Sequence, residues 1–213
     1  MKILILNGSP KGENSITLQT CLYLQKLYPE HTFEALHVGA RIKALEKDFT
    51  PAREALERAE ILLFSYPVYT FIAPCQLHRF IELLKESGIC VAGKFATQLS
   101  TSKHFYDITA HKYIEGNSID LGMKYIRGLS ADMEDLLEEK GRTDAEKFFE
   151  RFLWSVEEDV YTPAPRTAVC YEQVPVTLTD SCAKNKGKDI IVLTDETDEN
   201  SNLSRMIERF RAV

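Results

Sequence analysis

The 213-residue sequence lacks a long hydrophobic run and has no excess of positive charge. No apolar stretch approaches the roughly 20 residues that a membrane-spanning helix needs. Lys2 is followed by only four apolar residues before the chain becomes polar, which is too short for a secretory signal peptide. The formal net charge of -6 argues against nucleic acid or an anionic membrane as a main partner. We therefore expect a cytoplasmic protein that binds neither nucleic acid nor membrane.

Cysteine pairs in metal-binding spacing are also missing. The sequence has an odd number of cysteines and no CxxC motif; the five are Cys21, Cys75, Cys90, Cys170 and Cys182. Zinc and iron-sulfur sites built from cysteine usually use such closely spaced pairs. We expect no metal site, and thiols that stay reduced in a reducing compartment.

What remains is an ordinary globular composition, with 44% hydrophobic and 27% charged residues. Apolar runs bounded by turn residues predict five strands, and helical spacing predicts a helix after each of the first four. The strands are expected at 2–6, 32–38, 61–65, 94–100 and 123–129, and the helices at 16–27, 50–59, 74–88 and 110–121, with two more at about 132–139 and 143–158. Strands that alternate with helices form parallel sheets covered on both faces. The sequence therefore predicts a doubly wound α/β domain with five parallel strands over residues 1–159.

The remaining chain divides into two parts. Residues 160–188 contain three prolines and no helical pattern, which indicates a linker or a wrapped arm. Residues 189–213 predict a strand at 189–193 and a helix at 203–210, so that IIVLTDETDENSNL is a near copy of LILNGSPKGENSITL. This extension either begins a second α/β unit or completes the first sheet. Its acidic turn would repel a phosphate.

The turn after the first strand reads NGSPKGENS and has the chemistry of an anion site. Gly8 allows a sharp exit from the strand, small polar side chains surround the helix start, and Lys11 adds a mobile positive charge. A helix N-terminus offers unpaired N–H groups and the positive end of its dipole to a phosphate monoester. The turn matches neither the Walker loop nor GxGxxG. The simpler alternative is a strand-to-helix turn in which Ser15 is an ordinary N-cap.

Two further loops should lie beside this turn, because ligands of open parallel sheets bind at the carboxyl ends of the strands. The loop after the third strand is apolar and aromatic from Pro67 to Ile72, which suits a flat heterocycle stacked on Tyr69 or Phe71. A hydrophobic plug or a subunit contact would give the same pattern. The loop after the fourth strand begins with Ser100, Thr101 and Ser102.

Together, NGSPKGENS, YPVYTFIAPCQLHRFIELL and STS resemble the three flavin-binding loops of the NAD(P)H-dependent FMN reductase and flavodoxin-like oxidoreductase families, over about Lys2 to Leu129. The resemblance implies a flavodoxin-like fold, FMN as cofactor, NAD(P)H as co-substrate and a homodimer. It implies cofactor binding by Ser9, Lys11, Asn14, Ser15, Ile16, Thr17, Pro67, Val68, Tyr69, Thr70, Phe71, Ile72, Ser100, Thr101 and Ser102. The resemblance implies that the phosphate is held by Ser9, Lys11, Asn14, Ser15 and Thr17. The isoalloxazine would lie against Pro67 to Ile72, with Ser100 to Ser102 near the ring. Related iron-sulfur flavoproteins carry a cysteine cluster where this chain reads GARIKALEKDFTPAREAL, so we expect no iron-sulfur cluster.

We therefore expect an FMN-binding oxidoreductase that passes reducing equivalents from NAD(P)H to a small acceptor such as a quinone, a nitro compound or free flavin. Two alternatives remain: an electron carrier between proteins, and a flavin-free binding or assembly domain. The flavin carries the redox chemistry in such proteins, so the sequence names no catalytic residue. His104 and Tyr106 are possible proton donors, although a solvated histidine and a packed tyrosine are the simpler interpretation.

Overall fold

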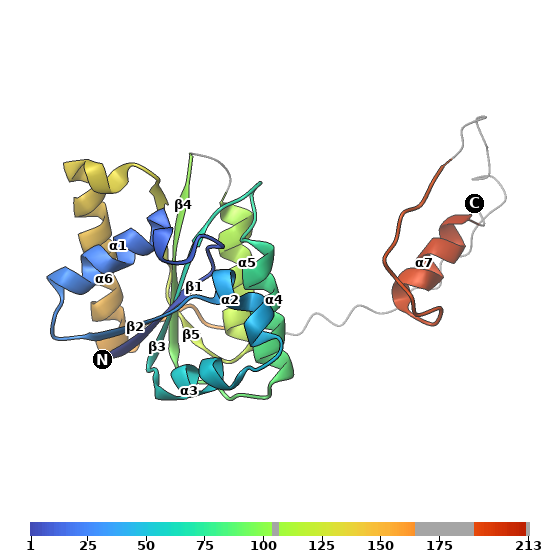
Figure 1. Ribbon diagram of the computed structural model, residues 1–213, viewed down its shortest axis with the longest axis horizontal. Helices are drawn as coiled ribbons and strands as arrows, with labels where there is room; N and C mark the ends of the chain where they lie inside the picture. The colour runs from blue at the N-terminus through green and yellow to red at the C-terminus, as the bar shows by residue number, and fades with distance from the viewer. Residues whose placement is uncertain (104–106, 165–189, 212–213) are drawn as a thin grey trace. The chain divides into compact units, whose positions relative to one another are not determined.

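The computed structural model describes residues 1–103, 107–164 and 190–211, and Figure 1 shows its elements. The chain divides into two compact units, Met1–Pro165 and Arg166–Val213. Each unit is described by itself. No helix among the described residues is long and apolar enough to cross a membrane.

The first unit is built around a parallel sheet. Its strands are β1 (Lys2–Asn7), β2 (Thr32–Leu36), β3 (Ile61–Pro67), β4 (Phe95–Ser102), β5 (Lys124–Tyr125) and β6 (Leu129–Asp132). The order is β2-β1-β3-β4-β5, and β6 also pairs with β4. Every pair between these strands is parallel. The predicted doubly wound fold is confirmed, and its strand order reverses between β1 and β3, where such sheets bind their ligands.

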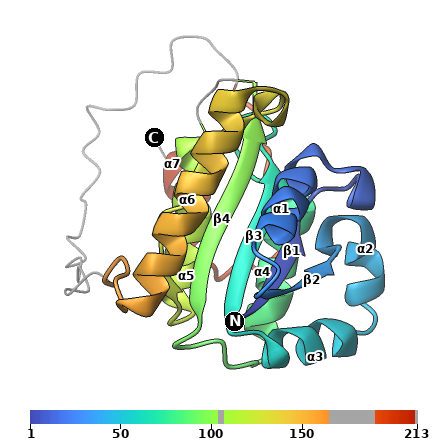
Figure 2. The same ribbon diagram turned by 90° about the vertical axis from the view of Figure 1, so that its left-hand side faces the viewer.

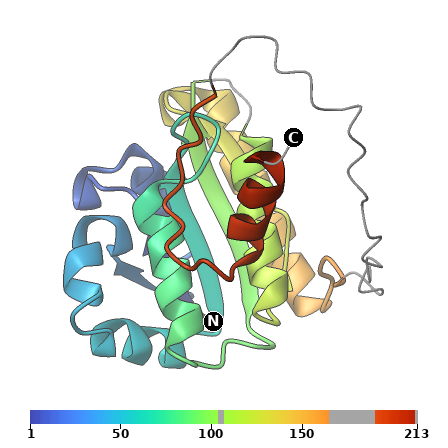
Figure 3. The same cartoon turned by 90° about the vertical axis from the view of Figure 1, so that its right-hand side faces the viewer.

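Helices cover both faces of this sheet. They are α1 (Ile16–Leu27), α2 (Val38–Leu45), α3 (Thr50–Arg58), α4 (Cys75–Glu86), α5 (Ile108–Asp120) and α6 (Glu139–Glu157), with short 3-10 turns at Gly12–Asn14 and Asp135–Leu137. Figure 2 shows α1 and α6 on one face, and Figure 3 shows α4 and α5 on the other. Helices on both faces require strands that are apolar throughout, as the near-continuous burial of β1 and β3 shows.

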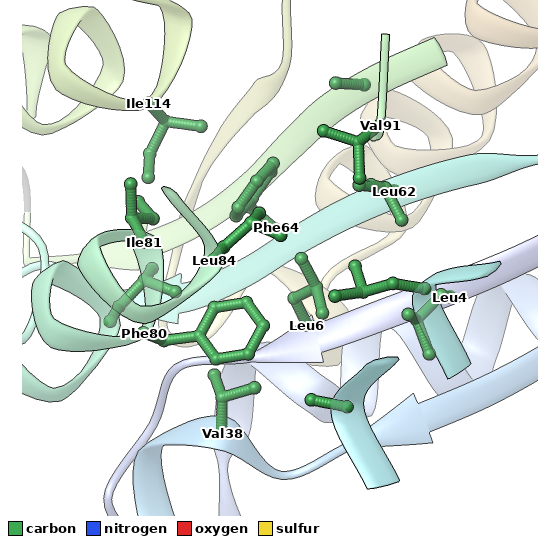
Figure 4. Close-up of a cluster of buried hydrophobic side chains, with 14 of the residues drawn as sticks. Leu4, Leu6, Val38, Leu62, Phe64, Phe80, Ile81, Leu84, Val91 and Ile114 are labelled. Atoms are coloured by element: carbon green, nitrogen blue, oxygen red, sulfur yellow. The ribbon is translucent and has the colours of Figure 1, made fainter. Parts of the chain in front are cut away.

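Alternate residues of each strand supply two separate cores. Leu4 and Leu6 point toward α2, α3, α4 and α5, where Phe64 and Phe80 pack with them (Figure 4). Ile3 and Ile5 point the other way, toward the apolar faces of α1 and α6. This period of two in side-chain direction is the property that turns an apolar strand into the centre of a three-layer domain.

The structure differs from the predicted elements in three regions of the chain. The single strand expected at 123–129 is two short strands, β5 and β6, joined at residues 126–128, where a Cβ on Gly128 would lie 2.0 Å from the Gln98 carbonyl oxygen of β4. The helix expected at about 132–139 is the end of β6 followed by a 3-10 turn, and α6 begins at Glu139 rather than near Thr143. The helix α2 is not predicted by the sequence, and it shortens the second strand to Leu36.

The described part of the second unit contains one helix, α7 (Asn202–Arg211). The expected helix at 203–210 is thus present. Residues 190–193, where the sequence predicts a strand, form no strand within the described part of the chain.

Candidate functional site

The turn after β1 is folded tightly around Asn7. The Gly8 N–H donates to the Ser65 carbonyl oxygen at 2.8 Å, and the Ser9 N–H donates to Asn7 Oδ1 at 3.2 Å. The Asn7 side chain also donates to the Gly12 carbonyl oxygen at 2.8 Å, while Gly12 takes a positive φ of 56°. Asn7 is fully buried, so its amide organises the turn from inside. Sequence reasoning missed this role, although an asparagine at the end of an apolar strand is itself a turn signal.

Two helices hold the turn in place from outside. A Cβ on Gly39 of α2 would lie 2.3 Å from the Gly8 carbonyl oxygen, and a Cβ on Gly8 would lie 2.9 Å from the Leu77 side chain of α4. The close approach of the Gly39 backbone to the Gly8 carbonyl group requires glycine at position 39. The turn is therefore fixed before any ligand arrives.

The start of α1 leaves backbone N–H groups without helical partners. Ser15 is the N-cap, and its Oγ accepts from the Leu18 N–H at 3.4 Å, as the simpler interpretation of this turn expects. The N–H groups at the first turn of a helix have no partner within the helix. Lys11 is exposed beside this turn and forms no ion pair with another described residue.

A pocket of about 240 Å3 joins this turn to the ends of β3 and β4. It is lined by Ser9, Lys11, Ser15, Ile16, Thr17, Pro67, Val68, Tyr69, Thr101, Ser102, Lys103 and Met133. The Thr17 and Thr101 hydroxyls are 2.6 Å apart and connect α1 to β4 across 84 positions of sequence. The pocket is polar near the start of α1 and apolar near Val68, Tyr69 and Met133.

The loop after β3 ends in a strained turn. Tyr69 and Ile72 exchange two backbone hydrogen bonds of 3.0 and 3.1 Å, and the two residues between them, Thr70 and Phe71, take φ values of 48° and 71°. Positive φ at both central residues defines the type I′ turn, which normally uses Asn-Gly. The turn places the half-exposed Tyr69 ring at the pocket, whereas Thr70, Phe71 and Ile72 are exposed and do not line it.

Five of the fifteen predicted cofactor residues lie outside this pocket lining: Asn14, Thr70, Phe71, Ile72 and Ser100. Ser100 is fully buried, and its Oγ is hydrogen bonded to His111 Nε2 at 2.8 Å. Burial lowers the pKa of His111 below its ordinary value, so the imidazole is neutral at pH 7. The proposed proton donors His104 and Tyr106 lie outside the described residues.

Two lining residues, Lys103 and Met133, are not among the predicted ones. Lys103 Nζ lies 2.6 Å from a Glu134 carboxylate oxygen, and this hydrogen bond raises the pKa of the lysine. Its charge is largely balanced by Glu134, which leaves Lys11 as the pocket lysine without an acidic partner in the described chain. Met133 follows β6, and its place at the pocket depends on the unexpected division of the last strand.

The acidic near copy explains why the first turn suits a ligand. The α7 helix uses the same cap, since Ser201 Oγ accepts from the Ser204 N–H at 3.0 Å. The carboxylates of its turn, however, bond to the turn itself: the Asp198 N–H donates to Glu196 Oε1 and the Asn200 N–H to Asp198 Oδ1. The bond from the Asp198 N–H is the main cause that lowers the pKa of Glu196. The acidic turn therefore supplies its own anions, whereas the turn after β1 has a single carboxylate, the exposed Glu13, and also carries Lys11.

Residues 1–139 match the model of a family that is described by its flavodoxin-like fold. The chain belongs to this flavodoxin-like family. No curated protein matches the chain. Among solved structures, the flavodoxin-like unit is similar to the apo form of the NADH:FMN oxidoreductase EMOB, with a TM-score of 0.62, 19% identity, and coverage of 77% of this chain and 91% of that chain.

Two further flavodoxin-like structures are similar over nearly their whole length. An NADPH-quinone reductase from P. pentosaceus gives a TM-score of 0.55 at 13% identity, covering 71% of this chain and 97% of that chain. An NAD(P)H:quinone oxidoreductase from Methanothermobacter marburgensis gives a TM-score of 0.54 at 14% identity, covering 78% of this chain and 99% of that chain. At these identities the likeness establishes the fold, and the site must be argued from its own chemistry.

Proposed function

We propose that the protein is an FMN-binding oxidoreductase that passes reducing equivalents from NAD(P)H to a small acceptor. One observation carries the proposal: the anion-binding start of α1 and an apolar wall with an aromatic ring line the same pocket, at the switch point of the sheet. A flavin mononucleotide has this combination, a phosphate at one end and a flat heterocycle at the other. The names of the similar structures support the same class of reaction.

The residues present fit the two ends of FMN. At the polar end, the first N–H groups of α1 and the ammonium of Lys11 would bind the phosphate, which a helix dipole favours. At the apolar end, Tyr69 offers a ring face for stacking, and Val68 and Met133 exclude water from the ring edge. We propose the cofactor-binding role for the ten predicted residues that line the pocket.

Flavin, when bound, supplies the hydride and electron transfer chemistry. The role of the chain itself would be to bind the flavin and to orient it. The prefolded turn around Asn7 holds the phosphate site without a conformational change, and the Thr17–Thr101 contact fixes the distance between the two ends of the pocket. Such preorganisation reduces the entropic cost of binding.

The test of this proposal is the purified full-length protein incubated with FMN. We expect a yellow protein with one bound FMN, whose absorbance is bleached anaerobically by NADH or NADPH and recovers when a quinone is added. A protein that stays colourless in the presence of FMN would overturn the proposal. A yellow protein that neither nucleotide bleaches would instead identify an electron carrier.

The phosphate end has its own test in Lys11→Glu. This exchange of an exposed charge should weaken FMN binding about tenfold, because it places a carboxylate beside the phosphate. Lys26→Glu is the matched control, since Lys26 lies in the last turn of α1 and does not line the pocket. Equal FMN affinity of the two variants, measured by fluorescence titration, would refute the assignment of Lys11.

A further inference from the structure

A second pocket, of about 450 Å3, lies beside α5 in the first unit. It has no lining residue in common with the pocket at the start of α1. It is lined by the side of α5 from Asp107 to Glu115, together with Tyr125, Arg127, Ser130 and Thr162. Binding sites for small molecules have volumes of roughly 300–1,000 Å3, so this cavity is large enough for one. We call it the α5 pocket.

The α5 pocket lies at the edge of the sheet, where the last strand is divided. Tyr125 ends β5 and Leu129 begins β6, and both strands pair with β4. Arg127 is the middle residue of the connection between them. After α6 the chain returns to this edge, where the Thr162 N–H donates to the Tyr125 carbonyl oxygen at 2.7 Å. The pocket therefore belongs to the first unit alone, and backbone pairing holds the segments that line it.

Most charged side chains of the α5 pocket already have partners. Lys112 Nζ lies 2.8 and 2.9 Å from the two carboxylate oxygens of Glu115. The Ser130 hydroxyl donates to the Asp107 carboxylate. The guanidinium of Arg127, by contrast, forms no hydrogen bond or ion pair with any residue that the structure describes. Arg127 is therefore the lining cation that is available to a ligand.

The guanidinium of Arg127 acts on two rings that line the pocket. Burial raises the pKa of Tyr125 to about 12, and Arg127 acts against this rise. Burial also lowers the pKa of His111, where Asp107 opposes the change and Arg127 adds to it. Charge effects of this kind act between groups that lie close together. The positive charge of Arg127 is therefore directed at the interior of the pocket.

An unpartnered guanidinium recognises anions. Its planar fork of donors matches the two oxygens of a carboxylate or of a phosphate. Arg127 supplies one positive charge, and the Asp107 carboxylate would repel a second negative charge on the ligand. A phosphate monoester carries about -1.5 to -2 charges at pH 7, whereas a carboxylate carries a single one. The charges of the pocket therefore favour a monocarboxylate.

The pocket also offers apolar surface for the rest of the ligand. The side chain of Ile108 is 71% exposed at the start of α5, and the rings of His111 and Tyr125 line the same cavity. A ligand that covers Ile108 removes apolar area from water, and an aromatic ligand can also contact the two rings.

We propose that the α5 pocket binds a small monocarboxylate with an apolar body. The carboxylate pairs with the guanidinium of Arg127, and the body lies against Ile108 and the rings of His111 and Tyr125. This site is separate from the proposed flavin site, and the inference does not depend on flavin binding.

Benzoate is the probe, because it joins one carboxylate to an aromatic body. We expect it to bind the full-length protein with a dissociation constant on the order of 0.1–1 mM, measured by NMR titration. The ring signals of His111, assigned with His111→Gln, should shift, whereas those of His31, which lies beside the Met1 amine, should not. No shift of the His111 signals up to about 20 mM benzoate would overturn the proposal.

Two relatives of benzoate test the charge of the ligand. Benzamide has nearly the same shape without the charge, and phenyl phosphate has the same ring with a more highly charged head. Each should bind at least about tenfold more weakly than benzoate. Equal or tighter binding of benzamide would refute pairing with Arg127. Equal or tighter binding of phenyl phosphate would refute the choice of a carboxylate and identify a phosphate site.

Substitution of Arg127 tests the position of the carboxylate. Arg127→Gln should weaken benzoate binding at least about tenfold, and Arg127→Lys should weaken it less, because lysine keeps the charge but loses the planar fork. Arg41→Gln is the control, since Arg41 is an exposed arginine of α2 that lines neither pocket. Benzoate affinity that falls no further in Arg127→Gln than in the control would overturn the assignment.

FMN distinguishes the two pockets. Benzoate affinity should be the same with and without saturating FMN, because the pockets share no lining residue. Loss of benzoate binding in the presence of FMN would place benzoate in the pocket at the start of α1 and refute the inference. A protein that binds benzoate through Arg127 but takes up no FMN would support the α5 site while the proposed function fails.

Discussion

At the scale of single residues, the turn at Tyr69–Ile72 holds conformational strain beside the pocket. Thr70 takes a φ of 48°, which disfavours a β-branched side chain because its Cβ is crowded by the backbone. Outliers of this kind persist where the surrounding structure enforces them, and they gather at ligand sites. Here the enforced geometry is the one that presents Tyr69 to the pocket.

Thr70→Asn should relieve part of this strain. Asparagine tolerates the left-handed region and is favoured at this position of a type I′ turn, so we expect the free energy of unfolding to rise by about 0.5–1 kcal/mol. Urea unfolding of the ligand-free protein measures the effect. Thr109→Asn, at an exposed helical position in α5, should leave stability nearly unchanged. A Thr70 variant that is less stable than the parent would contradict the presence of strain at this residue.

The buried imidazole of His111 gives a prediction about pH. Burial is the main cause that lowers its pKa, and Arg127 acts in the same direction, whereas Asp107 and Glu115 oppose it. Below the ordinary histidine pKa of about 6.5, the unfolded chain binds a proton that the folded chain does not, so the free energy of unfolding falls as pH falls.

His111→Gln should flatten that dependence. A glutamine does not titrate, and its amide can still bond to Ser100, so thermal unfolding of the variant should lose less stability between neutral pH and about pH 5 than the parent does. His78→Gln is the comparison, because burial also lowers the pKa of His78. Parallel stability–pH curves for the parent and the His111 variant would contradict the prediction, because they would mean that His111 has the same pKa in the folded and the unfolded chain.

At the scale of elements, α2 shapes the site most although it does not line the pocket. Its Gly39 lies against the Gly8 carbonyl group, and His37, just before it, contacts the Asn7 amide at 3.0 Å. This helix is missed by sequence reasoning, because eight residues carry little periodicity and the apolar pattern of the preceding strand continues to Val38. The prediction of a helix at Ile16–Leu27, which has a cap and a full apolar stripe, is confirmed at both ends.

Gly39→Ala tests the contact between α2 and the turn. A methyl group 2.3 Å from the Gly8 carbonyl oxygen must displace the turn or the helix, and we expect a loss of about 1–3 kcal/mol in stability together with weaker FMN binding. Gly116→Ala is the control: Gly116 is in α5, and a methyl group added there would meet no atom within 4 Å, so this variant should be slightly more stable than the parent. Unchanged stability of Gly39→Ala would disprove the close contact.

At the scale of the whole molecule, both cores lie in the first unit. Every buried residue of the two clusters falls between Ile3 and Phe152, and the segment that follows α6 still pairs with the sheet through the 2.7 Å bond from the Thr162 N–H to the Tyr125 carbonyl oxygen. α7 contributes no buried residue. The first unit therefore contains the apolar burial that stabilises the fold.

A chain that ends at Pro165 should fold by itself. We expect a melting temperature within a few degrees of the full chain and the same FMN affinity, since the removed residues add nothing to either core. Calorimetry and fluorescence titration measure the two quantities. An unfolded or insoluble fragment would mean that the extension contributes to the stability of the first unit.

The sequence by itself determined the alternation of strands and helices, the turn at Gly8–Ser15 and the absence of that turn's lysine and glycines from the near copy, because these are patterns of neighbouring residues. Only the tertiary structure decided that Asn7 holds the turn, that Met133 reaches the pocket, and that Ser100 turns away to His111. The place of Met133 depends on the pairing of β6 with β4, whereas the roles of Asn7 and Ser100 depend on their burial. A buried amide or a split strand is selected by what packs against it, and no local pattern records that choice.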